Sequence, residues 1–412
     1  EPGKPLGFLD AHIQCGNALL GLKDLNELEK GIPKDAFKAL SGDDKGICKQ
    51  LTKENKDGLK ALEKAFDRQQ TISLSLESAV GYNELQALDA LPDDTLADIA
   101  AKDQAYRAYK QQAQGSRLLH AANLLVGAFL LEKTEVSQDI IPTSKTLYLE
   151  LFSESRSTQH EQQLGAATMA CEEARVLHWP LVFPQVFRAG GFDCVLGNPP
   201  WERIKLQEEE FFASRSQMVA SAGNKAERSQ RIDWLSQGLL AQNLYPGQVS
   251  SFETREAEQR LYREFIVARR TAEAASVFAH VNGEDGGRFP LTGVGDVNTY
   301  ALFSETIRQV IGPMGRAGFI VPSGLATDNT TKAFFGDLIE QRSLESFFEF
   351  ENEGYFKGAG QGHMLRFALT TVLGSQQQAG ATRFLFQGKQ LDELQNPERV
   401  FTLTAEEIFQ VN

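Results

Sequence analysis

The sequence is poor in the residues that would build a metal centre, a disulfide framework or a membrane span. Its 412 residues include four cysteines, which lie far apart with no C-x-x-C pair, and no H-x-x-x-H or H-E-x-x-H pattern accompanies them. Neither a zinc site nor a set of disulfides is therefore indicated. The longest apolar segment, residues 118–131, is too short to cross a bilayer. We expect no metal and no membrane partner, and free thiols typical of a reducing cytoplasm.

An excess of positive charge is also missing. The formal net charge is -13, which argues against a protein that covers nucleic acid through bulk charge. A locally basic cleft is still compatible with this number. Lys and Arg are frequent over residues 203–231 and 255–270, but Asp and Glu almost match them. This balance favours solvated helix faces and leaves phosphate contacts as the alternative.

Four short runs of β-branched and aromatic residues, each bounded by Gly, Pro or Asn, predict strands. They cover residues 192–197, 316–324, 344–352 and 365–373. Between them lie the helical patterns TYALFSETIRQVIG and TTKAFFGDLIEQR, which have the lengths of β-α-β crossovers. The second half of the chain is therefore predicted to be α/β.

Residues 23–170 have a different pattern, in which apolar side chains recur at spacings of three and four. This spacing predicts a large helical insertion. A second, charged helical excursion is expected at about 205–275. Before the insertion, residues 8–15 alternate in polarity and end at Gly16-Asn17, which predicts a strand followed by a turn.

The stretch FDCVLGNPPWERI places an amide, two prolines and a tryptophan directly after a predicted strand. Open α/β sheets bind ligands beyond the carboxyl ends of their strands. Pro199 and Pro200 fix φ and lack N–H donors, so carbonyl groups of this stiff turn can face a ligand as acceptors. The side chain of Asn198 adds another acceptor. Two acceptors match the two protons of an exocyclic amine, and Trp201 offers an aromatic face to the ring that carries it.

This arrangement suits methyl transfer to an aromatic amine. In duplex DNA such an amine is reachable only when its base is flipped out of the stack. An amine activated by position needs no strong general base, and none is conspicuous beside the motif. Transfer from a sulfonium donor therefore fits. The alternative is a structural role, in which the motif is a tight loop whose tryptophan packs on the core.

The motif G-N-P-P-W resembles motif IV, [DNS]-P-P-[YFW], of the gamma class of DNA adenine-N6 methyltransferases. The longer stretch is more similar to the large chains of type IIG restriction-modification enzymes and related phage-defence systems. The resemblance covers residues 5–22 and about 175–375. It implies a partial Rossmann-like class I methyltransferase sheet, S-adenosylmethionine as the cofactor and double-stranded DNA as the partner.

The resemblance also implies roles for individual residues. Asn198 and the Pro199 carbonyl would accept hydrogen bonds from the adenine N6 amine, with Pro200 completing the catalytic motif. Trp201 would stack on the flipped base. The stretch FFEFENEGYF resembles motifs VII and VIII, where Phe356 matches a second aromatic residue that packs against the target base.

Three further residues match positions beside the cofactor. The stretch GDVNTYALF resembles motif V, which would place Asn298 and Tyr300 at the methionine end of S-adenosylmethionine. The stretch CGNALLG resembles motif III, where a side chain reaches the cofactor adenine. Many relatives have Asp at this position, whereas this chain has Asn17, for which a turn-forming role is the alternative.

The resemblance divides the chain into four parts. Residues 1–22 would begin the methyltransferase core, 23–170 would be the insertion, 171–375 would carry motifs IV to VIII, and 376–412 would begin a connection to a target-recognition domain. Motifs I and II, which supply the Gly-rich turn and the ribose-binding acid, would precede residue 5. The chain thus looks like an internal segment of a longer enzyme, outside which a target-recognition domain and a linked nuclease could lie.

A weak affinity for the cofactor follows from this expectation. Without motifs I and II, the 412-residue chain would lack about half of its cofactor pocket, so we expect it to bind S-adenosylmethionine weakly or not at all and to be inactive alone. Isothermal titration calorimetry measures this affinity directly. Micromolar binding by the chain would contradict the expectation.

Two other functions stay open. A non-catalytic scaffold could use the insertion and the sheet to contact DNA or a defence partner. A protein-glutamine methyltransferase could use a similar N-P-P-[YF] motif, although those enzymes usually carry Tyr or Phe in place of Trp and lack such an insertion. Nuclease chemistry is not expected within this segment, because Pro92-Asp93 has no matching carboxylate-x-Lys downstream.

Overall fold

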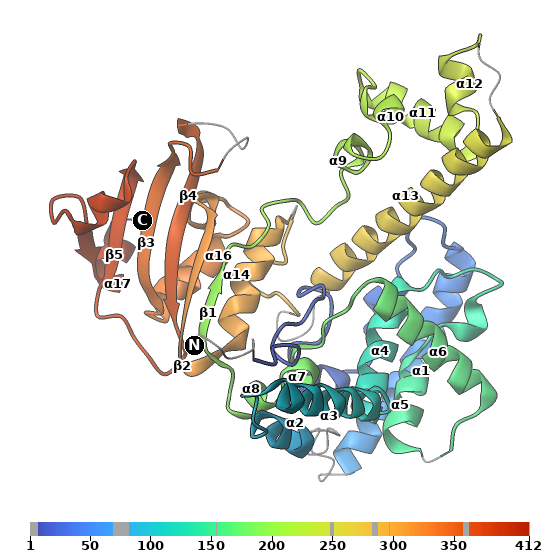
Figure 1. Ribbon diagram of the computed structural model, residues 1–412, viewed down its shortest axis with the longest axis horizontal. Coiled ribbons are helices and arrows are strands. Elements are labelled where there is room, and N and C mark those ends of the chain that lie inside the picture. The colour runs from blue at the N-terminus through green and yellow to red at the C-terminus, as the bar shows by residue number, and fades with distance from the viewer. Residues whose placement is uncertain are drawn as a thin grey trace.

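The computed structural model describes residues 7–68, 82–153, 155–247, 251–281, 287–295, 297–356 and 362–411. Three parts are visible in Figure 1. A β-sheet with its helices lies on one side, a body of packed helices lies on the other, and a helical arm projects away from that body. We call the helices within residues 45–188 the helical body and those within residues 208–279 the arm.

A single mixed sheet contains all six strands of the described ranges, in the order β1-β2-β4-β3-β5-β6. β1 runs parallel to β2 and β3 runs parallel to β5, whereas β4 is antiparallel to both of its neighbours and β6 is antiparallel to β5. The strands are β1 (Phe192–Gly197), β2 (Ile311–Pro322), β3 (Leu344–Asn352), β4 (Gly362–Leu373), β5 (Thr382–Gly388) and β6 (Phe401–Leu403).

The four predicted strands are confirmed as β1 to β4, and the two predicted crossover helices as α14 (Thr299–Val310) and α16 (Lys332–Glu340). Both helices bury an apolar face against the sheet, together with the short helix α15 (Gly324–Thr327). Alternate residues of β2, such as Ala317 and Phe319, point into this core because successive strand side chains face opposite sides. Burial on this scale supplies most of the stability of a sheet and helix layer.

Residues 376–412 add strands and a helix that sequence analysis did not predict. β5 and β6 continue the sheet beyond β3, and helix α17 (Ala405–Val411) follows β6. Phe384 of β5 lies in the same core as α16, and Ile408 of α17 packs against that core. Residues 376–412, which we expect to begin a connection to a target-recognition domain, therefore also form part of the sheet and its core.

The strand predicted over residues 8–15 is wrong. The amide of Ile13 donates to the Leu9 carbonyl at 2.9 Å, so the segment forms a turn. Phe8 and Ala11 are buried against helices α2 (Tyr82–Asp89) and α3 (Leu96–Gln114). A strand needs a paired neighbour for its backbone groups, and no strand of the described residues lies beside this segment.

The described residues of 23–170 are mainly helical, and most of their helices belong to the helical body; that they form an insertion stays a prediction. Its centre is α4 (Arg117–Leu130), which is apolar on nearly all sides and buried from Ala121 to Leu130. A Cβ on Gly127 would lie 2.6 Å from the Cβ of Ala167, so α4 and α6 approach closely there. The other helices are α1 (Lys45–Arg68), α5 (Ser144–Phe152), α6 (Thr158–Glu173), α7 (Trp179–Val182) and α8 (Pro184–Arg188). Three 3-10 helices span Leu25–Leu28, Lys34–Phe37 and Gln138–Ile140. No helix in the described ranges combines the length and the apolar character needed to span a bilayer.

The arm lies where a charged helical excursion is expected, at about residues 205–275. It consists of α9 (Glu208–Ala213), α10 (Gln217–Ala220), α11 (Lys225–Gln237), α12 (Leu240–Leu244) and α13 (Phe252–Ala279). Its own small core contains Phe212, Leu235 and Phe265. The C-terminal part of α13 returns to the helical body, where Ala274 and Phe278 join the main helical core.

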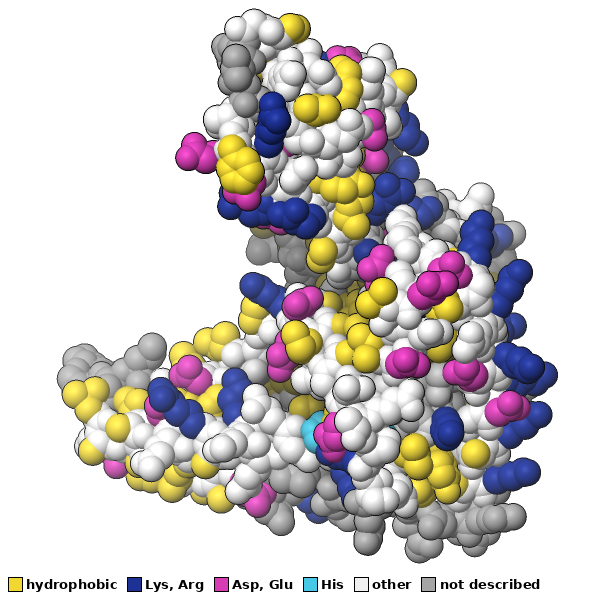
Figure 2. Space-filling view, turned by 90° about the vertical axis from the view of Figure 1, so that its right-hand side faces the viewer, with side chains coloured by type: hydrophobic (Ala, Val, Ile, Leu, Met, Phe, Trp, Pro, Cys, Tyr) yellow, Lys and Arg dark blue, Asp and Glu magenta, His cyan; other side chains and the backbone are white. Residues whose placement is uncertain are grey.

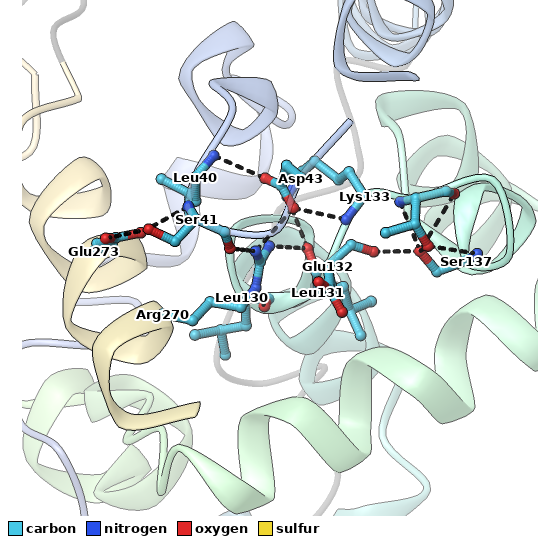
Figure 3. Close-up of polar contacts among 11 residues, drawn as sticks. Leu40, Ser41, Asp43, Leu130, Leu131, Glu132, Lys133, Ser137, Arg270 and Glu273 are labelled. Carbon is cyan, nitrogen blue, oxygen red and sulfur yellow. Dashed lines mark hydrogen bonds and ion pairs between the residues drawn. The ribbon is translucent and has the colours of Figure 1, made fainter. Parts of the chain in front are cut away.

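A buried ion pair fastens α13 to the helical body (Figure 3). The guanidinium of Arg270 lies 2.8 Å from the carboxylate of Asp43, whose side chain is fully buried. Arg270 also donates to the carbonyls of Ser41, Leu130 and Leu131 at 3.0, 3.1 and 2.7 Å. The C-terminal part of α13 is thus held by an ion pair and by hydrogen bonds to two stretches of chain, residues 41–43 and the end of α4.

Candidate functional site

The loop Asn198–Trp201 follows β1 at its carboxyl end, as the sequence predicts. Pro199 is buried and Trp201 half-buried, whereas Asn198 is exposed. Among the described residues, neither the side chain of Asn198 nor the carbonyl of Pro199 has a hydrogen-bond partner. Neither acceptor is therefore engaged by another described group. β1 itself is an edge strand, and its Leu196 is 81% exposed.

Trp201 forms one wall beside these acceptors. Its Nε1 donates to the Ile320 carbonyl of β2 at 3.4 Å, which fixes the indole against the sheet. The ring centroid of Phe356 lies 5.0 Å away, with the two ring planes inclined at 63°. Phe367 of β4 lies behind Phe356, at 5.0 Å and 88°. Two aromatic residues far apart in the sequence thus form adjoining walls of one corner.

Asn352, at the end of β3, positions Phe356. Its side-chain Nδ2 donates to the Phe356 carbonyl at 2.9 Å, and its Oδ1 accepts from the Phe356 amide at 2.8 Å. Asn352 is fully buried. The amide therefore closes the turn that brings Phe356 back onto Trp201. Sequence analysis missed this residue, although an Asn at the end of an apolar strand was a usable signal.

We expect Asn352→Ala to lower the free energy of unfolding by about 1–3 kcal/mol, because a buried side chain with two backbone partners is lost. The ring of Phe356 would no longer be held against Trp201. Urea unfolding measures the first effect. Because the chain has three tryptophans, the exposure of Trp201 is measured as the difference in acrylamide quenching between the chain and its Trp201→Phe variant. Glu353→Ala, at an exposed neighbouring position, is the control, and equal effects of the two substitutions would contradict this role of Asn352.

The segment Asn298-Thr299 is tied to the chain that follows the motif. Asn298 forms a bridge with Arg203, and the Thr299 amide donates to the Glu202 carbonyl at 2.8 Å. The Thr299 hydroxyl lies 2.8 Å from the Pro200 carbonyl and 2.9 Å from that of Glu202. The Pro200 carbonyl therefore already has a donor, unlike that of Pro199. Thr299 is a second residue that sequence analysis missed.

These residues surround one cavity of about 670 Å³, a size typical of sites for small ligands. Its lining includes the residues predicted to hold the target base, Asn198, Pro199, Pro200, Trp201 and Phe356, and one predicted to bind the cofactor, Asn298. Glu202, Arg203, Gln207 and Glu210 complete the lining. The cavity thus has two unpaired acceptors, an aromatic corner and charges of both signs.

Tyr300 does not line this cavity. It is buried in the core between α14 and the sheet, and its hydroxyl donates to Asp328 at 3.2 Å. Burial, with the charge and hydrogen bond of Asp328, raises the pKa of Tyr300 to about 12. Tyr300 is therefore held as a neutral donor to a carboxylate, and its contact with a cofactor stays a prediction.

Asn17 lines a second cavity, of about 1010 Å³, which adjoins the first. Pro200, Glu202 and Arg203 line both cavities, and one side of the second is a face of α13. The side chain of Asn17 accepts from the Leu19 amide at 3.2 Å, the geometry of a turn-forming Asn. Asn17 is thus both in a turn and at a cavity wall, so neither of its two predicted roles is excluded.

Comparison with known proteins gives one family match. The family described as Eco57I restriction-modification methylase matches residues 120–233, a range that includes the loop Asn198–Trp201 and most of the arm before α13. None of the curated proteins matches the chain. The family match thus covers the loop Asn198–Trp201, but neither Asn298 nor Phe356, and less than half of the sequence.

Two solved structures share weak similarity with this chain. One is a nuclease-deletion mutant of the Type ISP restriction-modification enzyme LlaGI in complex with a DNA substrate mimic, at 11% identity and a TM-score of 0.20, covering 88% of this chain and 36% of that one. The other is the ATP-dependent Type ISP restriction-modification enzyme LlaBIII bound to DNA, at 11% identity and a TM-score of 0.20, covering 92% and 30%. The chain spans about a third of the length of these proteins, and similarity this low establishes no shared fold.

Proposed function

We propose that this chain carries the catalytic half of a DNA methyltransferase, which transfers the methyl group of S-adenosylmethionine to the N6 amine of a flipped adenine in a restriction-modification or phage-defence system. The observation that carries the proposal is the pair of unpaired acceptors, Asn198 Oδ1 and the Pro199 carbonyl, in one cavity with the corner of Trp201 and Phe356. The match of residues 120–233 to a restriction-modification methylase supports the reaction type.

In this proposal the site acts mainly by positioning. The N6 amine donates one hydrogen to Asn198 and the other to the Pro199 carbonyl, which turns its lone pair toward the methyl donor. Holding the amine in this orientation avoids much of the entropic cost of the reaction. The two acceptors also stabilise the positive charge that develops on nitrogen, and the extra proton leaves to solvent after transfer. Trp201 stacks on the base, and Phe356 closes its edge.

The residues present fit part of a cofactor site. Asn17 and Asn298 carry amide groups that can bond the polar ends of S-adenosylmethionine, and they lie in two adjoining cavities that share Pro200. The bound cofactor supplies the electrophilic methyl group. Pro200 is held between the two cavities by the Thr299 hydroxyl, so the chain itself can fix the distance between base and cofactor.

The proposal includes a Rossmann-like class I methyltransferase sheet. The parallel pair of β1 and β2, followed by the reversed strand β4 beside β3, is compatible with one half of such a sheet. The sequence of β1 is largely apolar, and apolar strands are typical of the interior of parallel sheets. Its open edge and the 81% exposed Leu196 support the expectation that further strands flank β1 in the working enzyme.

Transfer of labelled methyl from S-adenosylmethionine to DNA tests the proposal, measured with this chain and with the chain extended upstream. Digestion to nucleosides then identifies the methylated base. Label in N6-methyladenine is the expected result. Label in glutamine of a protein substrate would favour the protein-glutamine methyltransferase, and no label despite cofactor binding would favour the non-catalytic scaffold.

A further inference from the structure

A row of lysines runs along α1 of the helical body and takes no part in the candidate site. Lys45, Lys49, Lys53, Lys56 and Lys60 follow one another at spacings of three and four, which places them on one face of the helix. All five are exposed, and none of them has an ion-pair partner among the described residues. We call these five residues the lysine stripe.

The opposite face of α1 fixes the direction of the stripe. Leu51 is buried in the main helical core. The side chain of Asn55, also buried, accepts a hydrogen bond from the Ser144 amide of α5 at 2.7 Å. At Gly58 a Cβ would lie 2.3 Å from the backbone nitrogen of Lys145, so α1 and α5 touch through their backbones. Because α1 cannot rotate about its axis, the lysine stripe must face solvent.

Folding alone does not explain the stripe. Like charges three and four residues apart weaken a helix. Asp57 lies four residues after Lys53, and Glu63 lies three after Lys60, but neither acid forms an ion pair with the stripe among the described residues. The stripe concentrates five cations along about 22 Å of helix, in a chain of net charge -13. Figure 2 views the side on which α1 lies in Figure 1, and Lys and Arg side chains follow one another down the right-hand edge of its lower body.

We propose that the lysine stripe binds the phosphate backbone of duplex DNA outside the target base pair. The choice of DNA rests on the proposed function, because such an enzyme must hold this polyanion. Duplex DNA carries one negative charge about every 1.7 Å along its axis, so a stripe of this length meets enough phosphates for all of its lysines. Contacts to phosphates fix affinity and register without reading sequence.

A duplex fits the stripe better than a single strand does. Proteins that hold single-stranded DNA or RNA combine cations with aromatic side chains on which bases stack. The only aromatic residue of α1 is Phe66, which is half-buried and packs against the helical core. The stripe therefore offers charge without a stacking platform, which suits the outer surface of a double helix.

The salt dependence of DNA binding tests the inference. The measurement is the affinity of the chain for a fluorescein-labelled duplex of about 30 base pairs, over a series of salt concentrations. In the triple variant K49Q/K53Q/K56Q, the slope of log K against log salt should become shallower by about 0.9 for each lysine removed. The control is K110Q/K332Q/K389Q, which removes the same charge from exposed lysines of other elements and should leave the slope nearly unchanged.

Three outcomes would overturn the inference: equal slopes for the two triple variants, no duplex binding by the chain, or stripe-dependent binding of single-stranded RNA alone. Failure of the proposed function gives a different pattern. If methyl transfer is absent but the slope still depends on the stripe, the stripe binds DNA and the enzymatic proposal is wrong. If adenine is methylated and the slopes of the two triple variants agree, only the inference about the stripe is wrong.

Discussion

Replacing Asn198 by alanine is expected to lower methyl transfer to DNA at least about a hundredfold, the usual cost of removing one positioned acceptor or donor from a reacting group. The side chain is exposed and has no hydrogen-bond partner among the described residues, so its loss should change the free energy of unfolding by less than about 0.5 kcal/mol. Because the chain alone is expected to be inactive, single-turnover transfer and urea unfolding are both measured on one preparation of the chain extended upstream.

Asn198→Asp is the matched control for this prediction. A carboxylate retains an oxygen acceptor at the same distance from the backbone, and the motif [DNS]-P-P-[YFW], which this loop resembles, admits Asp at this position. We therefore expect the Asp variant to retain far more activity than the Ala variant. Equal and small effects of both substitutions would show that the exposed amide does not hold the reacting amine. A large loss of stability in Asn198→Ala would assign the residue a structural role instead.

The position of this loop could be predicted because its causes are local. The strand β1 has a short apolar run bounded by Gly, and the Asn-Pro-Pro sequence cannot continue a strand, since Pro lacks the N–H that a ladder needs. The crossover helices α14 and α16 were equally readable from apolar spacing over ten or more residues. Each of these features is determined within its own stretch of chain.

The parts that could not be predicted depend on contacts between distant residues. Residues 8–15 alternate like a strand, but α2 and α3 bury Phe8 and Ala11 and no strand of the described ranges is available to pair with the segment. The position of β5 in the sheet is determined by its pairing with β3. The amino-acid pattern of β5 alone does not show which strand it pairs with. In the site, the pairing of Phe356 with Trp201 could be expected only from the family resemblance, and its cause, Asn352, is visible only in three dimensions.

Replacing Arg270 by alanine is expected to lower the free energy of unfolding by about 3–5 kcal/mol, because it leaves a buried carboxylate without its partner. The side chain of Asp43 is fully buried, and its remaining hydrogen bonds come from the amides of Leu40 and Lys133. The other cation near it is the ammonium of Lys133, whose pKa burial lowers and Asp43 raises. The substitution also deprives the carbonyls of Ser41, Leu130 and Leu131 of a charged donor. Urea or thermal unfolding measures this loss.

The neighbouring residue provides a control on the same turn of α13. Arg269 is 45% exposed and pairs with Glu273 at 3.2 Å, and a surface pair of this kind contributes about 0–1 kcal/mol. Arg269→Ala should therefore have a small effect, and similar losses for the two variants would contradict the anchoring role of Arg270. Because a face of α13 also lines the cavity that Asn17 lines, the proposed function predicts that the Arg270 variant loses affinity for DNA before it unfolds. Such a loss would show that the anchoring of α13 by Arg270 maintains the shape of the cavity that α13 and Asn17 line.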